Sequence, residues 1–285
     1  MSSGLTYVYC FIRASRRPAL RDVPDGMPGG TNLRAIEVGD QLWAIVDTVL
    51  ESDYGEAPLA RGLQDLDWVG ERAVAHERVT EHFLSASALL PMQLFTLFTS
   101  DDRVVEHARA DRRRIAGILK RIDRKVEWGL RLTWDEKAAR EKVERKHAGL
   151  PRRSRGLSAE ARGAKAEAAK AGAAYLARKR DVLDVNRAQL AGARVEAGRV
   201  YRAIARAAAE ALRRTSLERA APGSRLLLDA AFLVPTAKAA AFRAALRTHT
   251  RALRGSGVAV SLTGPWPPYN FIGPPPRRGA PARHA

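Results

Sequence analysis

The N-terminal part of the chain carries the apolar pattern of β-strands. Residues 5–12 (LTYVYCFI) form a short run of aromatic and β-branched side chains, which predicts a buried strand. Two further apolar runs, 33–38 and 42–49, flank the turn residues Gly39 and Asp40. This spacing predicts a β-hairpin, so the chain is expected to open with three strands.

A helical period follows. Asp65 or Asp67 is expected to cap a helix that runs to about Ala86, because the apolar positions beyond them recur at helical spacing. These positions form one stripe along the predicted helix: Leu66, Val69, Ala73, His76 and Phe83.

The next two segments are a strand-like run and a second helix. Residues 89–98 (LLPMQLFTLF) break the helical period and predict a strand with Pro91 at its start. Ser100 is then expected to cap a helix. Its inner stripe consists of Val104, Ala108, Ile115, Leu119 and Ile122, with arginines toward solvent.

The C-terminal part mixes both patterns again. Segments 126–133, 225–234 and 257–263 predict strands, and 235–253 predicts a helix. Strands and helices in this mixed order, with a hairpin among them, indicate the α+β class.

Most of the net charge of +18 lies in one stretch. Residues 137–219 contain 22 Lys and Arg against 9 Asp and Glu, and the segment 149–158 should interrupt the helical pattern there. Beyond Ser158 a helix of about 55 residues is predicted. Its apolar positions recur every seven residues, as in a coiled-coil seam: Leu176, Leu183, Leu190, Ala197, Ile204 and Ala211.

The composition predicts the cellular compartment of the protein. The chain has 285 residues and one cysteine, which excludes a disulfide within the chain and favours a reducing cytoplasm. No run approaches the roughly 18 apolar residues that a membrane-spanning helix needs. The N-terminus lacks the pattern of a signal peptide, so a cytoplasmic protein is expected.

The sequence offers no catalytic or cofactor motif. It contains no P-loop, no G-x-G-x-x-G after a strand and no G-x-S-x-G elbow. His76 and His82 are six residues apart, whereas a helical zinc site needs histidines four apart, so no metal site is expected. Cys10 is predicted to be a buried, inert thiol. We therefore expect no enzyme activity.

Aromatic residues concentrate near the C-terminus. Residues 264–271 (GPWPPYNF) combine rigid prolines with three aromatic rings. The rings of Trp266, Tyr269 and Phe271 either fasten the terminus over the domain core or form a partner-binding surface. Trp128, in the strand predicted for 126–133, is a further aromatic candidate.

These residues resemble a known family. The ending LTGPWPPYNF (262–271), preceded by AAFLVP (230–235) and AAFRAAL (240–246), is similar to the gas vesicle protein GvpL/GvpF family. Other similar segments follow in the same order over nearly the whole chain: YVYCFI, DWVGERAVAHERV, LLPMQLFTLF, VEWGLRL and AAYLARKR.

The resemblance implies two α+β domains and a role in binding. The domains would be 1–125 and 126–285, the second ferredoxin-like and containing the helical segment 137–219 and a disordered tail from about 274. A cytoplasmic, non-enzymatic accessory or minor structural protein of gas vesicles is implied, which binds the shell subunit and other accessory proteins. Residues expected to bind partners or to support the fold are Trp128, Trp266, Tyr269, Asn270, Phe271, Arg178, Lys179 and Arg180.

The basic helix leaves one alternative open. A nucleic-acid-binding protein would use such a helix to follow phosphates. Only Tyr175 and Tyr201 lie among the basic residues of this segment, so it lacks the regular aromatic spacing of a single-strand platform. Within the gas vesicle interpretation, the same helix is expected to bind an acidic surface of a protein partner.

Overall fold

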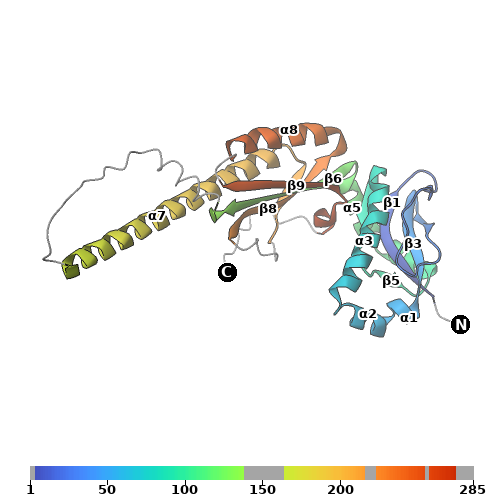
Figure 1. Cartoon of the computed structure of the whole chain (residues 1–285). Coiled ribbons are helices and arrows are strands. Elements are labelled where there is room, and N and C mark those ends of the chain that lie inside the picture. Colours follow the sequence, from blue (N-terminus) through green and yellow to red (C-terminus); the bar gives the residue numbers. More distant parts are fainter. Residues whose placement is uncertain (1–3, 138–163, 216–222, 254–256, 274–285) are drawn as a thin grey trace. The chain divides into compact units, whose positions relative to one another are not determined.

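The computed structural model shown in Figure 1 describes residues 4–137, 164–215, 223–253 and 257–273. The predicted break at 149–158 and the predicted tail from 274 lie outside these residues. The chain divides into two compact units. The sequence predicted two domains with a single boundary near residue 125. Two C-terminal segments belong to the first unit, which consists of 1–128, 232–239 and 263–285, whereas the second consists of 129–231 and 240–262.

The first unit is built on an antiparallel sheet with β1 at its centre. Within the described residues the strands have the order β2-β3-β1-β4, and β5 also pairs with β1. The predicted first strand and hairpin are confirmed. The strand bounds are Gly4–Arg13 (β1), Arg34–Gly39 (β2), Leu42–Leu50 (β3), Ala88–Pro91 (β4) and Leu97–Phe98 (β5).

The loop between β1 and β2 is fastened to buried polar groups of the sheet. The Tyr9 hydroxyl accepts a hydrogen bond from the Met27 amide at 2.7 Å and donates one to Asp47 at 3.3 Å. Asp47 also accepts from the Asn32 amide at 3.0 Å. A side chain at Gly30 would collide with the Asp47 carboxylate, so glycine is required where the loop passes this close.

The helix α3 (Leu66–His82) begins as predicted at Asp65, whose carboxylate accepts hydrogen bonds from two backbone amides of the first turn. Leu66 is 85% exposed, so its predicted place in the inner stripe is wrong. The first turn packs through Trp68 instead, which stacks on Phe95 with ring centroids 5.4 Å apart. Farther along, α3 buries His76, Val79 and Thr80.

Three short helical turns flank α3. They are α1 (Glu51–Tyr54), α2 (Glu56–Gly62) and the 3-10 turn η1 (Phe83–Ser85). The first two were not predicted, whereas the third lies within the helix predicted to run to about Ala86. All are too short for a periodic apolar pattern to show.

The strand predicted for 89–98 is interrupted. β4 ends at Pro91 and β5 begins at Leu97, with a turn between them in which Phe95 has a φ of +64°. Proline has no N–H for a ladder hydrogen bond, so Pro91 ends a strand rather than starting one.

The helix predicted after Ser100 consists of two helices. They are α4 (Asp101–Ala110) and α5 (Arg112–Ile122), joined at Asp111. The Ser100 hydroxyl caps α4, as predicted, by accepting from the Arg103 amide at 3.4 Å. The predicted inner stripe is confirmed, since all five residues are buried: Val104, Ala108, Ile115, Leu119 and Ile122.

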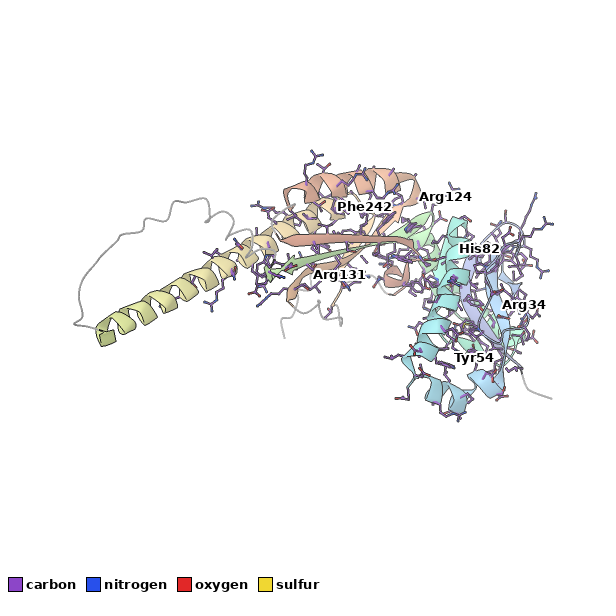
Figure 2. The ribbon with its side chains drawn as sticks, in the orientation of Figure 1. Arg34, Tyr54, His82, Arg124, Arg131 and Phe242 are labelled. Carbon is purple, nitrogen blue, oxygen red and sulfur yellow. The ribbon has the colours of Figure 1, made fainter. Side chains whose placement is uncertain are left out.

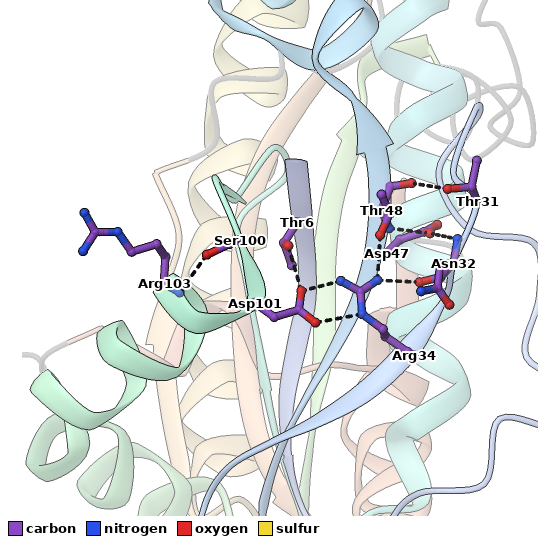
Figure 3. Close-up of polar contacts among 9 residues, drawn as sticks. All are labelled: Thr6, Thr31, Asn32, Arg34, Asp47, Thr48, Ser100, Asp101 and Arg103. Carbon is purple, nitrogen blue, oxygen red and sulfur yellow. Dashed lines mark hydrogen bonds and ion pairs between the residues drawn. The ribbon is translucent and has the colours of Figure 1, made fainter. Parts of the chain in front are cut away.

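A charged pair fixes the start of α4 to the sheet (Figure 3). Arg34 of β2 forms a two-pronged ion pair with Asp101, with its Nε 2.9 Å from the carboxylate. The Thr6 hydroxyl donates to the same carboxylate at 2.8 Å, and Arg34 donates to Thr48 at 2.8 Å. The hydrogen bonds from the Arg34 guanidinium hold the pKa of Asp101 below its usual value.

The second sheet has the strand order β7-β8-β6-β9 within the described residues. The predicted strands in 126–133, 225–234 and 257–263 are confirmed, and the last is longer than expected. Phe242 and Leu246 of α8 are buried (Figure 2). The bounds are Lys125–Asp135 (β6), Glu210–Arg213 (β7), Ser224–Pro235 (β8), Val258–Trp266 (β9), Ala239–Thr250 (α8), Thr236–Lys238 (η2) and Arg251–Leu253 (η3).

The long helix α7 (Ala164–Ala205) is shorter than predicted at its C-terminal end (Figure 1). Ala211 lies in β7, not in the helix, because pairing with β8 outweighs the helical propensity of this Ala-rich segment. The predicted heptad positions Ala197 and Ile204 are buried and Leu190 packs beside Trp134. The buried residues of α7 are Asn186, Ala193, Ala197, Val200 and Ile204, and the side chains of 164–179 and 181–183 lie outside the description.

A buried carboxylate joins three parts of the second unit. The Asp229 side chain is only 3% exposed. Arg131 of β6, labelled in Figure 2, approaches one of its oxygens to 3.2 Å. Arg214, just after β7, donates to the other at 2.8 Å. Two guanidinium groups therefore compensate one buried charge.

The buried His76 makes the stability of the first unit dependent on pH. Its Nδ1 shares a 2.6 Å hydrogen bond with the Tyr7 hydroxyl, and burial lowers the pKa of His76 to about 4. An unfolded histidine has a pKa near ~6.5. Between these values the unfolded chain binds a proton that the folded chain does not, so stability falls as the pH falls through this window.

We predict that wild type loses about 3 kcal/mol of unfolding free energy from this group between pH 6.5 and pH 4. His76→Gln should remove that part of the pH dependence, as measured by urea unfolding across the range. The exposed His82 offers the matched control: His82→Gln makes the same substitution at the surface, so the difference between the two variants isolates the buried site. Equal profiles for His76→Gln and wild type would contradict the assignment.

Candidate functional site

The C-terminal aromatic segment packs on the first unit, to which it belongs. β9 ends at Trp266, Pro267 and Pro268 are buried, and the 3-10 turn η4 (Tyr269–Phe271) follows. The hydrogen-bonding partners of η4 come from α3 and β6, which lie far away in the sequence.

Asn270 binds the buried carboxylate of Glu127 with two groups. Its backbone amide donates to one oxygen at 2.9 Å, and its side-chain amide donates to the other at 2.5 Å. Glu127 lies on β6 and is 3% exposed. Hydrogen bonds to a charged acceptor are stronger than neutral ones, so this pair anchors the segment.

Tyr269 makes a second polar contact. Its hydroxyl donates to Glu77 of α3 at 2.8 Å. Burial raises the pKa of Glu77, and burial together with the nearby Glu77 charge raises the pKa of Tyr269. The phenol therefore stays protonated and can donate at neutral pH.

Phe271 supplies the apolar part of the anchor. Its ring is 1% exposed, and the Arg121 guanidinium of α5 lies 6.0 Å from the ring centroid. Arg121 also donates to the Gly273 carbonyl at 2.7 Å.

The turn into the motif requires glycine. Gly264 has a φ of +115°, which side chains with a Cβ rarely adopt. A Cβ at this position would lie 2.8 Å from the Glu127 carbonyl oxygen. The first residue of the GPWPPYNF motif is thus set by its close approach to β6.

The two tryptophans of the candidate set lie in different environments. Trp128 of β6 is 5% exposed, so it belongs to the core, whereas Trp266 is 36% exposed. Trp266 is therefore more exposed than the core ring that was one of the two alternatives predicted from the sequence. The reason is positional: Trp266 ends an edge strand, and Pro267 and Pro268 turn inward after it.

The three basic candidates lie together on α7, away from the C-terminal motif in sequence. Arg178, Lys179 and Arg180 are consecutive helical residues. Arg180 is exposed, and the side chains of the other two lie outside the description.

Within the described residues no three His, Cys, Asp or Glu side chains are close enough to hold a metal ion. The Nδ1 atom of His76 is hydrogen-bonded to the Tyr7 hydroxyl in the core. The His82 ring packs edge-on against the Phe83 ring, with centroids 5.0 Å apart. Cys10 is fully buried, as predicted, and burial raises the pKa of its thiol.

Sequence reasoning missed the residues that receive the motif. Glu77, Arg121 and Glu127 come from three separate elements. One signal was present, because Glu127 is an acidic residue between the apolar residues Val126 and Trp128 of a predicted strand. A buried charge needs a partner, although nothing in the pattern identifies Asn270 as that partner.

The comparisons with known proteins identify the family. The family described as gas vesicle synthesis protein GvpL/GvpF matches residues 5–273. The chain belongs to this family. It is also 31% identical over 274 residues to gas vesicle protein L of Streptomyces sp. (strain CB03234), covering 94% of this chain and 93% of the Streptomyces protein.

Two solved structures of GvpF share the fold of this GvpL/GvpF family member. The crystal structure from Anabaena sp. PCC7120 aligns with a TM-score of 0.62 at 14% identity and covers 95% of this chain and 99% of that one. The structure from Microcystis aeruginosa aligns with a TM-score of 0.59 at 13% identity and covers 95% and 100%. No helix in the described part of the chain is long and apolar enough to cross a membrane.

Removing the Glu127 carboxylate should loosen the C-terminal segment. Glu127→Ala leaves two donors of Asn270 without their acceptor, and we expect a loss of about 2–3 kcal/mol in the free energy of unfolding. Urea unfolding measures it. Glu106→Ala, which breaks an exposed ion pair with Arg103, is the control and should cost much less, because water screens that pair. Equal losses would contradict the anchor.

Truncating Phe271 and Trp266 one at a time should show how much each ring contributes to the stability of the fold. Phe271→Ala is expected to cost about 3–5 kcal/mol because it empties a buried site. Trp266→Ala should cost less than about 2 kcal/mol, since its ring is already partly in water. Thermal and urea unfolding report both values. A larger loss for Trp266→Ala than for Phe271→Ala would contradict the assignment of Trp266 as the exposed ring.

Proposed function

We propose that this protein assists gas vesicle formation by binding, as an accessory or minor structural component that contacts the shell subunit and other gas vesicle proteins. The observation that carries this proposal is the family match over residues 5–273. The 31% identity with a gas vesicle protein L along nearly both full lengths supports it. It would act without catalysis, in the cytoplasm and at the gas vesicle.

We also propose that the C-terminal sheet and its helices form a ferredoxin-like domain. The described elements follow the order β6, α7, β7, β8, α8, β9, which is the β-α-β-β-α-β order of that fold. The strand order β7-β8-β6-β9 supports the same assignment. Trp134 of β6 packs with Ala193 of α7, so at least one of the two helices covers this sheet.

Trp266 and the basic residues Arg178, Lys179 and Arg180 stay candidates for partner contacts. The exposed indole of Trp266 suits an interface anchor. Nothing favours the nucleic-acid alternative. On the described part of α7, Arg187 and Arg199 pair with acidic residues one helical turn away, at 3.5 and 2.6 Å, which reduces the free positive charge.

A strain that lacks this gene tests the proposed function. We expect it to form few or no gas vesicles, as counted by electron microscopy, and the purified protein to retain the purified shell subunit or another gas vesicle protein in a pull-down. Restoring the gene in trans controls for effects on neighbouring genes. Normal vesicles in the deletion strain, together with no retained protein, would overturn the proposal.

A further inference from the structure

A cavity of about 730 Å³ lies in the first unit between the β2–β3 hairpin and the helices α4 and α5. We call it the arginine groove, after the three arginines of its helical wall: Arg109, Arg112 and Arg113. Its volume lies in the range of roughly 300–1,000 Å³ that ligand sites occupy.

The three arginines have no ionic partner among the described residues. Arg109, Arg112 and Arg113 are exposed and form no ion pair there. Their neighbour Arg114, which does not line the groove, pairs with Asp111 at 2.6 Å. The positive charge on this wall is therefore not neutralised within the described chain.

Two of these arginines, Arg112 and Arg113, lie where the helix dipole disfavours a cation, whereas Arg109 lies in the last turn of α4, where a cation is favoured. α5 begins at Arg112 and has no acidic residue in its first turn. The N-terminal end of a helix carries partial positive charge, which disfavours cations. A sequence choice that opposes local stability is expected at a functional site, so this wall is suited to receive negative charge.

The rest of the groove defines the shape of its occupant. The opposite wall carries the exposed carboxylates of Glu37 and Asp40. Arg13 also lines the groove, and its charge is paired with Asp123 at 3.5 Å. Buried apolar side chains line it as well, among them Val38, Ile115 and Leu119. Two walls of opposite charge beside apolar side chains accept a segment in one orientation only, because the reversed segment would place like charges together.

We propose that the arginine groove docks a segment of another gas vesicle protein. That segment carries Asp or Glu along the edge that faces α4 and α5, apolar side chains in its centre, and Lys or Arg toward Glu37 and Asp40. This inference rests on the proposed function, since it gives that binding a location. A nucleic-acid strand fits less well, because the two hairpin carboxylates repel phosphates.

The test is the triple variant R109E/R112E/R113E in the full chain. Its affinity for the purified shell subunit and for each other purified gas vesicle protein of the same organism is compared with that of wild type by biolayer interferometry. Binding to the partner should weaken about ten-fold or more, because the attracting wall now repels. The matched control K238E/R247E/R251E changes three exposed basic residues outside both the groove and α7, has the same net charge and should stay within about two-fold of wild type. Circular dichroism verifies folding.

A second variant tests the hairpin wall. E37K/D40K adds positive charge, yet it should weaken binding several-fold if the partner has a basic edge there. Stronger binding by E37K/D40K would overturn the proposed partner chemistry. A labelled single-stranded oligonucleotide serves as the nucleic-acid probe. If R109E/R112E/R113E no longer binds the oligonucleotide that wild type binds, while its binding to gas vesicle proteins is unchanged, the proposal is overturned.

The binding measurements distinguish a wrong docking site from a wrong proposed function. If wild type binds a gas vesicle protein and R109E/R112E/R113E binds it equally well, the groove is not the docking site, although the proposed function stands. If wild type binds none of the purified proteins, the proposed function itself fails.

Discussion

The buried carboxylate of Glu127 is the constraint on which the position of the chain's C-terminal segment depends. It lies on β6 with 3% of its surface exposed, and a charge in such a place is stable only when hydrogen bonds replace its hydration. Asn270 supplies two of them across 143 positions of sequence. The described C-terminal segment therefore packs on the first unit.

Acidic side chains hold other segments in the same way. Asp47 fastens the loop between β1 and β2, and Asp101 fixes the start of α4 to β1 and β2. Asp229 gathers two arginines in the second unit. In this chain 49 Lys and Arg outnumber 31 Asp and Glu, and several of the acidic groups are used where one carboxylate joins separate elements.

The surroundings of each charged side chain therefore say more about this protein than its net charge does. Arginines such as Arg34 and Arg214 are bound to carboxylates and support the fold. Arg109, Arg112 and Arg113 of the arginine groove have no described acidic partner, although carboxylates lie on the opposite wall. The difference separates arginines that stabilise this protein from arginines that are free to bind another one.

The sequence by itself determined the elements that have a clear period. It predicted the first strand, the hairpin, the caps at Asp65 and Ser100 and the buried stripe of α4 and α5, because local propensity and apolar spacing act over a few residues. Its family motifs also identified the protein's class. Tertiary structure alone decided that Leu66 and Trp266 are exposed, that α7 ends at Ala205, and that Glu127 binds Asn270. Those outcomes depend on contacts between residues distant in the chain, which no local pattern records.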